Sequence, residues 1–404
     1  MNHRKIRICL LLLFGAGGSL AAQRTNAPSP SYHIYAGNTH AHTIYTASHG
    51  DQYVPDRSKK LILIGSTQYG TNKALKSDWE KFQGPPAAHY ALAKANGYDF
   101  YITTDHSQEA PFQPPNPTNA AWVATHREAT AATDGNFVAI AGYEHSENNG
   151  PNGVGHLNVI NSAEYLNALA PGIDLPYLYQ WLKTVPPAGD GPVVASFNHS
   201  GPHQYNDWDY RDPEVTDIIT MLEVINSNKK IHYAAFINAL DKGWKVSPVC
   251  GNDNHGFWGI SHHTSRTFVL ATNKTQGAIL DAMKNRRTYA SLDKNIQCQY
   301  TVNGAIMGST LDRPESFRFD ISISDPDTGN PRDKITKIDI VKDGGAEAQS
   351  YSPAPAYAVT WRPALQDATN KYFFVRVWNA GGGDAAGADP THPIAWLAPV
   401  WTGR

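Results

Sequence analysis

The stretch GNTHAHT, Gly37–Thr43, places two histidines two residues apart at the end of the first apolar segment of the folded chain. The apolar alternation over residues 32–35 that precedes it predicts a β-strand. Along a strand, residues i and i+2 share one face and lie about 6.6 Å apart, so His40 and His42 can converge on one ion. Taken alone, the pair is better explained as two surface histidines, and the rest of the chain has to decide.

Strand and helix patterns alternate from residue 30 to residue 293. Near-continuous apolar strands with helices between them predict a parallel sheet that is covered by helices. Six or more such strands in about 260 residues fit an α/β fold that forms a barrel or a distorted barrel. Strands are predicted at 98–107, 136–146, 155–161, 192–200, 217–227 and 244–255, and helices at 84–97, 117–135, 174–185 and 229–243.

The periodicity changes to two after residue 296. Segments 316–325, 334–344 and 371–379 alternate apolar and polar residues, and Gly, Pro and Asp lie in the turns between them. This pattern predicts a small all-β sandwich domain over residues 296–404, following a barrel domain over residues 30–293. The polar, irregular segment 50–83 is predicted to be an inserted surface loop or lid.

Composition and the N-terminus restrict the class of protein. The 404 residues are 41% hydrophobic and 17% charged, and a formal net charge of −2 argues against a nucleic-acid partner. Residues 1–22 join a basic start to an apolar run and a small-residue exit, which predicts a cleaved signal peptide and a secreted or periplasmic protein. No later run is long enough for a membrane span. Cys250 and Cys298 remain in the mature chain, either as a disulfide or as two unpaired thiols.

Polar residues follow one apolar strand after another. The seventeen histidines are the compositional anomaly of this chain, and several of them fall at predicted strand ends. In parallel α/β folds, that end of the sheet is where ligands bind. Imidazole and carboxylate together are the ligands of Zn, Mn or Fe, and so many ligands imply more than one ion. The residues are His40, His42, Asp105, His106, Glu144, His145, His156, Asn198, His199, Glu223, Asp253 and His255.

The order of these motifs resembles the PHP (polymerase and histidinol phosphatase) superfamily over residues 33–292. HxH is followed by Thr-Asp-His, Gly-Tyr-Glu, a lone His, a His after an apolar strand, and Asn-Asp-Asn-His. The segments RTFVLA, RRTYAS and YTVNGAIMGS resemble the secreted, carbaryl-hydrolase-like branch of that superfamily. The resemblance implies a distorted seven-stranded barrel of PHP type that holds two or three divalent metal ions. Amidohydrolases, which also begin with HxH, are the second choice because they lack the third-strand Glu and the final DxH.

The resemblance also implies which residues bind these ions. Glu144 would bridge two of the ions, and Asp105 would support the set from behind the ligands. Asn38 and Asn252 depart from the family pattern, which has Asp and Ser there. The implied ligands are His40, His42, Glu144 and Asp253 for the first ion, Glu144, His156 and His199 for the second, and His49, His106 and His255 for the third.

The expected activity is hydrolysis of a phosphoester or another ester-like bond in a small-molecule substrate by metal-activated hydroxide. The catalytic residues are expected to be Glu144, His199 and Asp253, with Arg266 as a phosphate clamp unless it is an ordinary solvated arginine. A carboxyl or carbamate esterase of the same family is the alternative activity. An exported binding protein with a structural metal core is the alternative class.

Other residues have an open role at this stage. The aromatic residues Tyr205, Trp208, Phe257 and Trp258 either wall a pocket or pack in a core. The sequence does not indicate an oligomeric state.

Overall fold

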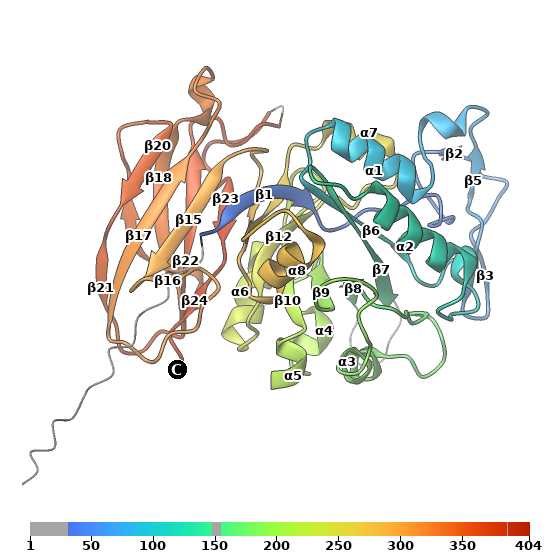
Figure 1. Cartoon of the computed structure of the whole chain (residues 1–404), viewed down its shortest axis with the longest axis horizontal. Coiled ribbons are helices and arrows are strands. Elements are labelled where there is room, and N and C mark those ends of the chain that lie inside the picture. The colour runs from blue at the N-terminus through green and yellow to red at the C-terminus, as the bar shows by residue number, and fades with distance from the viewer. Residues whose placement is uncertain (1–30, 148–154, 386) are drawn as a thin grey trace, which may run out of the picture. The chain divides into compact units, whose positions relative to one another are not determined.

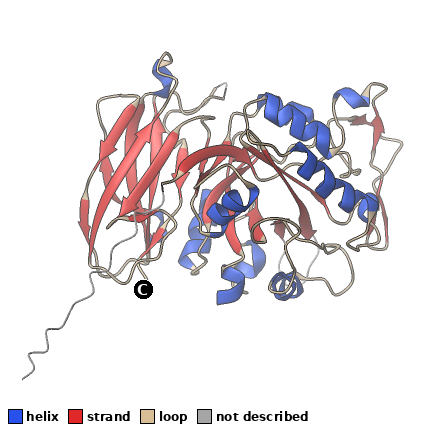
Figure 2. Ribbon diagram, in the orientation of Figure 1, coloured by secondary structure: helices blue, strands red, loops and turns tan. Residues whose placement is uncertain are grey.

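The computed structural model describes residues 31–147, 155–385 and 387–404. The predicted signal peptide, residues 1–22, lies outside these ranges. The helices and strands of the described chain follow the predicted order closely. The helix expected at 84–97 is α1 (Pro86–Ala95), and the strand expected at 98–107 is β6 (Phe100–His106). Figure 2 shows helices in the N-terminal part, whereas the C-terminal part consists of strands and two short turns of 3-10 helix.

The strands of the N-terminal part form a mixed sheet, not the parallel sheet that we predicted. Two groups of parallel strands are separated by β8 (Gly155–Ile160), which runs antiparallel to both of its neighbours. The strand β13 (Arg266–Ala271) is antiparallel to β1 (His33–Asn38). The parallel groups are β1, β6 and β7 (Val138–Glu147), and β9 (Val194–Asn198), β10 (Ile219–Asn226) and β12 (Ser247–Gly251).

The reversed direction of β8 places a histidine at the site. His156 is the second residue of this strand and lies opposite Ser146 of β7 and Asn198 of β9. A strand that runs antiparallel begins at the edge where its parallel neighbours end. His156 therefore lies at the same edge of the sheet as the histidines that follow β1, β6 and β9.

Hydrogen bonds do not close this sheet into the barrel that we expected. The strand β12 pairs with β10, and no ladder hydrogen bonds connect it to β13 or β14 (Thr288–Ser291) in the described chain. Threonine hydroxyls span that gap: the Cys250 N–H donates to Thr267 Oγ1 (2.7 Å), and Thr288 Oγ1 donates to the Pro248 carbonyl (2.9 Å). The architecture is therefore a mixed α/β fold in which side chains, rather than a ladder, hold β12 against β13 and β14.

Helices cover the sheet with their apolar faces. Ile279 and Leu280 of α8 pack in one core with Phe100 and Val138, while Tyr90 of α1 packs in another that faces α2. Side-chain caps begin several helices, as at Asn119, Asp174 and Thr275. The further helices are α2 (Ala120–Ala132), α3 (Leu175–Leu182), α4 (Gln204–Asp207), α5 (Pro213–Thr216), α6 (Tyr233–Asp241), α7 (Phe257–His262) and α8 (Gln276–Lys284) (Figure 1).

The segment that we expected to be a loop or lid contains two short hairpins. They are β2 (Tyr53–Pro55) with β5 (Lys73–Leu75), and β3 (Ile62–Ile64) with β4 (Thr67–Tyr69). The residues of β3 are more than half exposed. This part of the chain is an irregular excursion between β1 and α1, as expected.

The C-terminal part continues the main sheet on one side and adds a second sheet on the other. The strand β23 (Ala395–Leu397) pairs with β14, so the sheet runs from the N-terminal part into β22 (Tyr372–Asn379) and β18 (Ile335–Lys342). Residues Tyr32–Arg404 form one compact unit. The remaining strands are β11 (Lys230–Ile231), β15 (Gln297–Val302), β16 (Ala305–Ile306), β17 (Ser316–Ser324), β19 (Ala346–Tyr351), β20 (Ala358–Trp361), β21 (Ala364–Gln366) and β24 (Val400–Trp401).

The structure shows the state of the two cysteines and the character of the helices. Cys250 and Cys298 are both free and buried, in different clusters of the core, so they do not form a disulfide. No helix among the described residues has the length and apolar character needed to cross a membrane.

The shared sheet predicts that the two parts unfold together. Deleting residues 293–404 would remove β23, whose residues Ala395–Leu397 pair with β14, and would expose Phe268 and Tyr289, which pack against the C-terminal sheets. We expect the shortened chain to aggregate and the intact chain to give a single transition in differential scanning calorimetry. Two independent transitions in the intact chain would contradict this expectation.

Candidate metal centre

The backbone after β1 pairs with the backbone after β12, and this pairing brings the first ligands together. The His42 N–H donates to the Asn254 carbonyl and the Asp253 N–H donates to the His40 carbonyl, both at 2.9 Å. Gly251 is required for this approach, because a Cβ at that position would overlap the Glu223 carboxylate and the Cβ of His40. The HxH pair is therefore fixed against the Asn-Asp-Asn-His loop by main-chain bonds.

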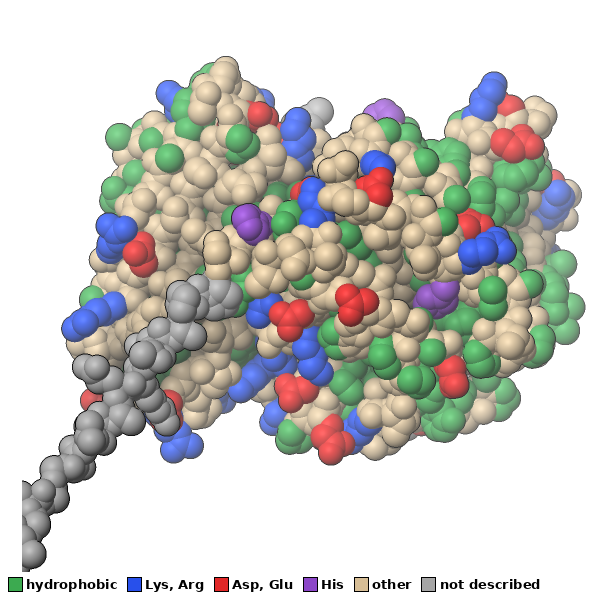
Figure 3. Space-filling model, in the orientation of Figure 1, with side chains coloured by type: hydrophobic (Ala, Val, Ile, Leu, Met, Phe, Trp, Pro, Cys, Tyr) green, Lys and Arg blue, Asp and Glu red, His purple; other side chains and the backbone are tan. Residues whose placement is uncertain are grey.

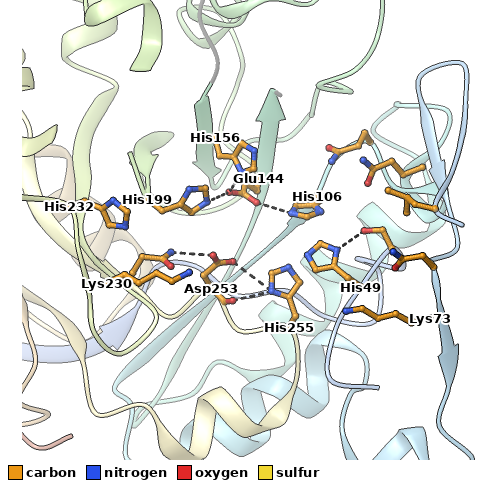
Figure 4. Close-up of a pocket in the computed structure, with 16 residues that line it drawn as sticks. His49, Lys73, His106, Glu144, His156, His199, Lys230, His232, Asp253 and His255 are labelled. Carbon is orange, nitrogen blue, oxygen red and sulfur yellow. Dashed lines mark hydrogen bonds and ion pairs between the residues drawn. The ribbon is translucent and has the colours of Figure 1, made fainter. Parts of the chain in front are cut away.

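Glu144 lies at the centre of the cluster. It is fully buried, and it lies inside β7 rather than at the strand end where we placed it. Figure 4 shows its carboxylate between rings that come from different strands. The nitrogen–oxygen distances from Glu144 are 3.2 Å to His156 Nδ1, 3.3 Å to His199 Nε2, 3.4 Å to His40 Nε2, 3.1 Å to His106 Nε2 and 3.6 Å to His42 Nε2.

Asp253 is the second carboxylate of the cluster. Its Oδ1 lies 3.1 Å from His42 Nε2, 3.5 Å from His40 Nε2 and 3.8 Å from His255 Nδ1. The residue has a positive φ of 47°, which an aspartate adopts more readily than most residues. The turn at Asp253 therefore directs the carboxylate back toward the HxH pair.

The third predicted group is also brought together, with one addition. The His49 and His255 rings stack with centroids 4.1 Å apart, and the His49 and His106 centroids are 5.3 Å apart. Glu109, which the sequence analysis missed, is fully buried and lies 3.5 Å from His106 Nδ1. It also accepts a hydrogen bond from Ser48 at 2.5 Å. Ligand atoms of His49, His106 and Glu109 lie close enough together to hold one ion.

Buried polar residues hold these rings from behind. Glu223 accepts a hydrogen bond from His40 Nδ1 at 2.7 Å and another from the His199 N–H at 2.8 Å, while Asn226 donates to Glu223 and Asp253. Such partners fix the tautomer and orientation of ligating histidines. Glu223 therefore lies behind the ligands and orients His40 and the backbone at His199.

Asp105 supports the cluster through the turn that follows the HxH pair. Its carboxylate accepts hydrogen bonds from the N–H and hydroxyl groups of both Thr43 and Thr46. Thr46 Oγ1 in turn lies 3.1 Å from His42 Nδ1. The departures Asn38 and Asn252 are hydrogen-bonded to each other, because the Asn252 N–H donates to Asn38 Oδ1 at 2.8 Å.

Glu144 and Asp253 are held in the ionised form. Burial alone would raise the pKa of Glu144, but His40 and His156 keep it well below its ordinary value. The pKa of Asp253 is lowered in the same way against the effect of burial, chiefly by His40, His42 and His255. Each buried carboxylate therefore requires positive charge beside it.

Several of the histidines are neutral, which is the form that binds metal. Burial, followed by the proximity of His255 and His106, lowers the pKa of His42 well below its ordinary value and that of His49 to about 2. Burial lowers the pKa of His255 to about 4. For His40, burial acts in the opposite direction to Glu144 and Glu223, which raise its pKa.

The residues present fit a group of divalent ions. In the described chain, His255 Nε2 and Glu109 Oε2 are buried without a hydrogen-bond partner, although both lie within the cluster. Sets of three ligand atoms converge at several points, among them His40, His42 and Glu144, and also Glu144, His156 and His199. Imidazole and carboxylate donors suit Zn, Mn or Fe, and the overlapping sets share Glu144.

A cavity of about 620 Å³ opens onto the cluster. Lys73 of β5 and Lys230 of β11 lie on opposite sides of it in Figure 4, with the histidines and Asp253 between them. The 50–83 segment supplies one wall through Leu61, Gln68, Asn72 and Lys73. The predicted surface loop thus borders the site. On the face drawn in Figure 3, acidic and basic side chains are interspersed and no large patch of one sign appears.

Arg266 lies outside this cavity lining. Its guanidinium donates to the His263 and Ser265 carbonyls and lies over the Tyr98 ring, 3.7 Å from the centroid. The catalytic role that we expected for Arg266 stays a prediction that this geometry does not support.

The aromatic residues considered for a pocket wall do not line the cavity either. Tyr205 and Trp208 are buried in the hydrophobic core, and Phe257 packs against the smaller hydrophobic core that contains Tyr90 of α1. Trp258 is 58% exposed, and its ring stacks on His262.

Sequence reasoning missed Lys73, Lys230, Glu109 and Asn226. Each lysine begins a very short strand, Lys73 in β5 and Lys230 in β11, whose path the local pattern does not determine. Glu109 carried a weak signal, since it follows His106 by three residues in a polar loop.

Comparison with solved structures finds distant similarities. No protein-family profile matches the chain, and no curated protein sequence matches it. The chain is similar to a two-domain protein containing a predicted PHP-like metal-dependent phosphoesterase from Bacteroides vulgatus ATCC 8482, with a TM-score of 0.45 and 17% identity over 91% of this chain and 95% of that one. It is also similar to the lesion-specific endonuclease PfuEndoQ from Pyrococcus furiosus, with a TM-score of 0.32 and 15% identity over 62% and 56% of the two chains. Neither likeness decides the activity of this chain.

Replacing Glu144 tests the centre of the cluster. Glu144→Gln keeps the side chain's size but removes the charge that balances two ions, so we expect loss of at least one metal ion and a fall in kcat/KM of at least about 100-fold. Metal analysis by mass spectrometry, with circular dichroism to check the fold, measures this. Unchanged metal content and rate would show that Glu144 does not bridge ions.

Replacing His49 tests the third group. His49→Ala should lower the metal content by one ion per chain and leave the others, because the remaining groups do not depend on this ring. His203→Ala is the matched control, since His203 is exposed and paired with Asp207 away from the cavity. Equal metal content in both variants would assign His49 no role as a ligand.

Proposed function

We propose that this chain is a multinuclear metal-dependent hydrolase that acts on phosphoester bonds, of the PHP type and its secreted, carbaryl-hydrolase-like branch. The observation that carries the proposal is the buried Glu144 carboxylate, which five histidines approach within 3.6 Å at the floor of a cavity. When bound there, divalent ions supply a nucleophile at neutral pH by acidifying water. A purely structural metal site has all four coordination positions filled by protein ligands. It needs neither a ligand shared between ions nor an open cavity above it.

Different residues would bind the metal ions and the substrate. The ligand set would comprise His40, His42, His49, His106, Glu144, His156, His199, Asp253 and His255, with Glu109 beside the third group. Lys73 and Lys230 would hold an anionic substrate from opposite sides of the cavity. Two cationic side chains and a metal group favour a phosphoester over a neutral ester.

His232 is the remaining titratable group of the cavity wall. Its Nδ1 lies 3.0 Å from the Ser200 carbonyl, to which it donates a proton in the matching tautomer. The other ring nitrogen, Nε2, is buried and has no hydrogen-bond partner in the described chain. In that tautomer Nε2 carries no proton, so it would be a free hydrogen-bond acceptor within this part of the cavity wall.

We further propose that the mature protein is exported and acts on small molecules. The sequence of residues 1–22 supports export. The volume of the cavity, about 620 Å³, supports a small substrate.

Chelation and metal replacement test the activity. We expect EDTA to abolish hydrolysis of p-nitrophenyl phosphate or its diester, and Mn, Zn or Fe to restore it. A p-nitrophenyl acetate arm reports the carboxyl esterase alternative. No turnover of any of these probes by metal-loaded protein would favour the exported binding protein instead.

The lysines predict a substrate-binding effect. Lys73→Ala and Lys230→Ala should each raise KM for the phosphoester by about 10-fold, because each removes one charge-assisted contact of about 1.5 kcal/mol. Lys94→Ala is the matched control, since Lys94 lies on α1, pairs with Asp134 and is absent from the cavity wall. A KM in the two cavity variants equal to that of the control would contradict the proposed role.

A further inference from the structure

A second cluster of acidic residues lies in the C-terminal part of the chain, separate from the metal centre. Its members are Asp293 after β14, Asp325 and Asp333 between β17 and β18, and Asp384 after β22. Asp293, Asp325 and Asp333 are at most 3% exposed. Three buried carboxylates in connecting loops are costly unless something neutralises them.

Hydrogen bonds from main-chain and side-chain groups bring these three connections together. The Lys294 N–H donates to Asp384 Oδ2 at 3.0 Å, and the Asp384 N–H donates to the Leu292 carbonyl at 3.3 Å. The Arg332 guanidinium donates to the Gly381 carbonyl at 3.0 Å. The loops that carry the four carboxylates are thus tied to one another.

In two of these residues, one carboxylate oxygen accepts hydrogen bonds from the backbone and the other oxygen accepts none. Asp293 Oδ1 accepts the N–H groups of Asn295 and Ile296, and Asp325 Oδ1 accepts the N–H of Asp327. Asp293 Oδ2, Asp325 Oδ2 and Asp333 Oδ2 are buried and have no hydrogen-bond partner among the described residues. The backbone therefore orients the carboxylates without satisfying them.

No lysine, arginine or histidine of the described chain forms an ion pair with any of these four aspartates. A different buried aspartate shows what the fold does when it compensates such a charge. Asp339 is fully buried in β18, and it pairs with Arg376 and Lys337 and accepts a hydrogen bond from Ser350. The acidic cluster lacks all of these partners.

The four carboxylates also act on one another. Burial, and then the proximity of Asp384 and Asp325, raises the pKa of Asp293. Burial, and then Asp325 and Asp384, raises the pKa of Asp333 to about 6. The carboxylates therefore repel one another, and the cluster either retains protons or holds a cation.

We propose that Asp293, Asp325, Asp333 and Asp384 form a Ca²⁺ site that ties the three loops together. The donors are oxygens, with no imidazole or thiolate among the four, which selects a hard cation. Irregular loops accommodate the flexible coordination of Ca²⁺ better than the strict octahedron of Mg²⁺. The Asp325–Asp333 segment, DPDTGNPRD, supplies two of the ligands from one short loop. The site does not depend on the proposed hydrolase activity.

Thermal unfolding of the full chain tests the proposal. Calcium at about 2 mM should raise the Tm of the wild type by about 3 °C over the same protein in EGTA, since extracellular sites bind Ca²⁺ with Kd of about 10⁻⁴–10⁻³ M. Magnesium at the same concentration should have a smaller effect. Equilibrium dialysis with ⁴⁵Ca should find one ion per chain that Glu144→Gln retains.

Asp325→Asn provides the sharper test, because the difference in Tm between this variant and the wild type should change sign when calcium is added. In EGTA the variant should melt at or above the wild-type temperature, because one repelling charge is gone, and in Ca²⁺ it should melt below it. Asp320→Asn is the matched control, since Asp320 is half exposed on β17 and pairs with Arg362. Asp384→Asn is a second variant, should Asp325→Asn not fold. A wild type that does not respond to Ca²⁺, or a variant less stable by the same amount in both conditions, would overturn the proposal.

Discussion

The structure depends on keeping one carboxylate, that of Glu144, ionised in the interior. Burying a carboxylate costs several kcal/mol unless positive charge and hydrogen bonds surround it. Five imidazoles approach the Glu144 carboxylate, and the Asn198 amide donates a hydrogen bond to it. These partners come from the ends of β1, β6, β8 and β9. The strand order around Glu144, including the reversed direction of β8, is what allows so many rings to reach one side chain.

A second layer of carboxylates makes that arrangement rigid. Glu223 holds His40 and the His199 N–H, and Asp105 holds the turn that orients His42. These contacts lie within and directly after strands, whereas the walls of the cavity come in part from the 50–83 segment. Under the proposed function, the rigid sheet would bind the metal, and irregular hairpins, which change more easily in evolution, would supply part of the contact with substrate.

The sequence predicted the elements and most of the cluster, because both follow from local patterns. The alternation of strand and helix patterns located β6, β7 and α2, and the histidines stood out as polar residues at the ends of apolar strands. The direction of β8 was not predictable, because a six-residue apolar strand has the same pattern in either direction. Barrel closure, the lysines of the cavity and the position of Arg266 depend on long-range packing, which no local pattern contains.

The two clusters of buried polar side chains in this chain differ in the kind of donor atom that they offer to an ion. The N-terminal cluster mixes imidazole with carboxylate, whereas the C-terminal cluster has carboxylates alone, so each would select a different class of cation. The two places are connected mechanically through β14, which pairs with β13 on one side and β23 on the other and leads directly into Asp293. An ion at Asp293 would therefore fix the end of the strand by which the C-terminal sheet is joined to the sheet that carries the metal centre. Stability of the whole sheet would then respond to an ion that never contacts substrate.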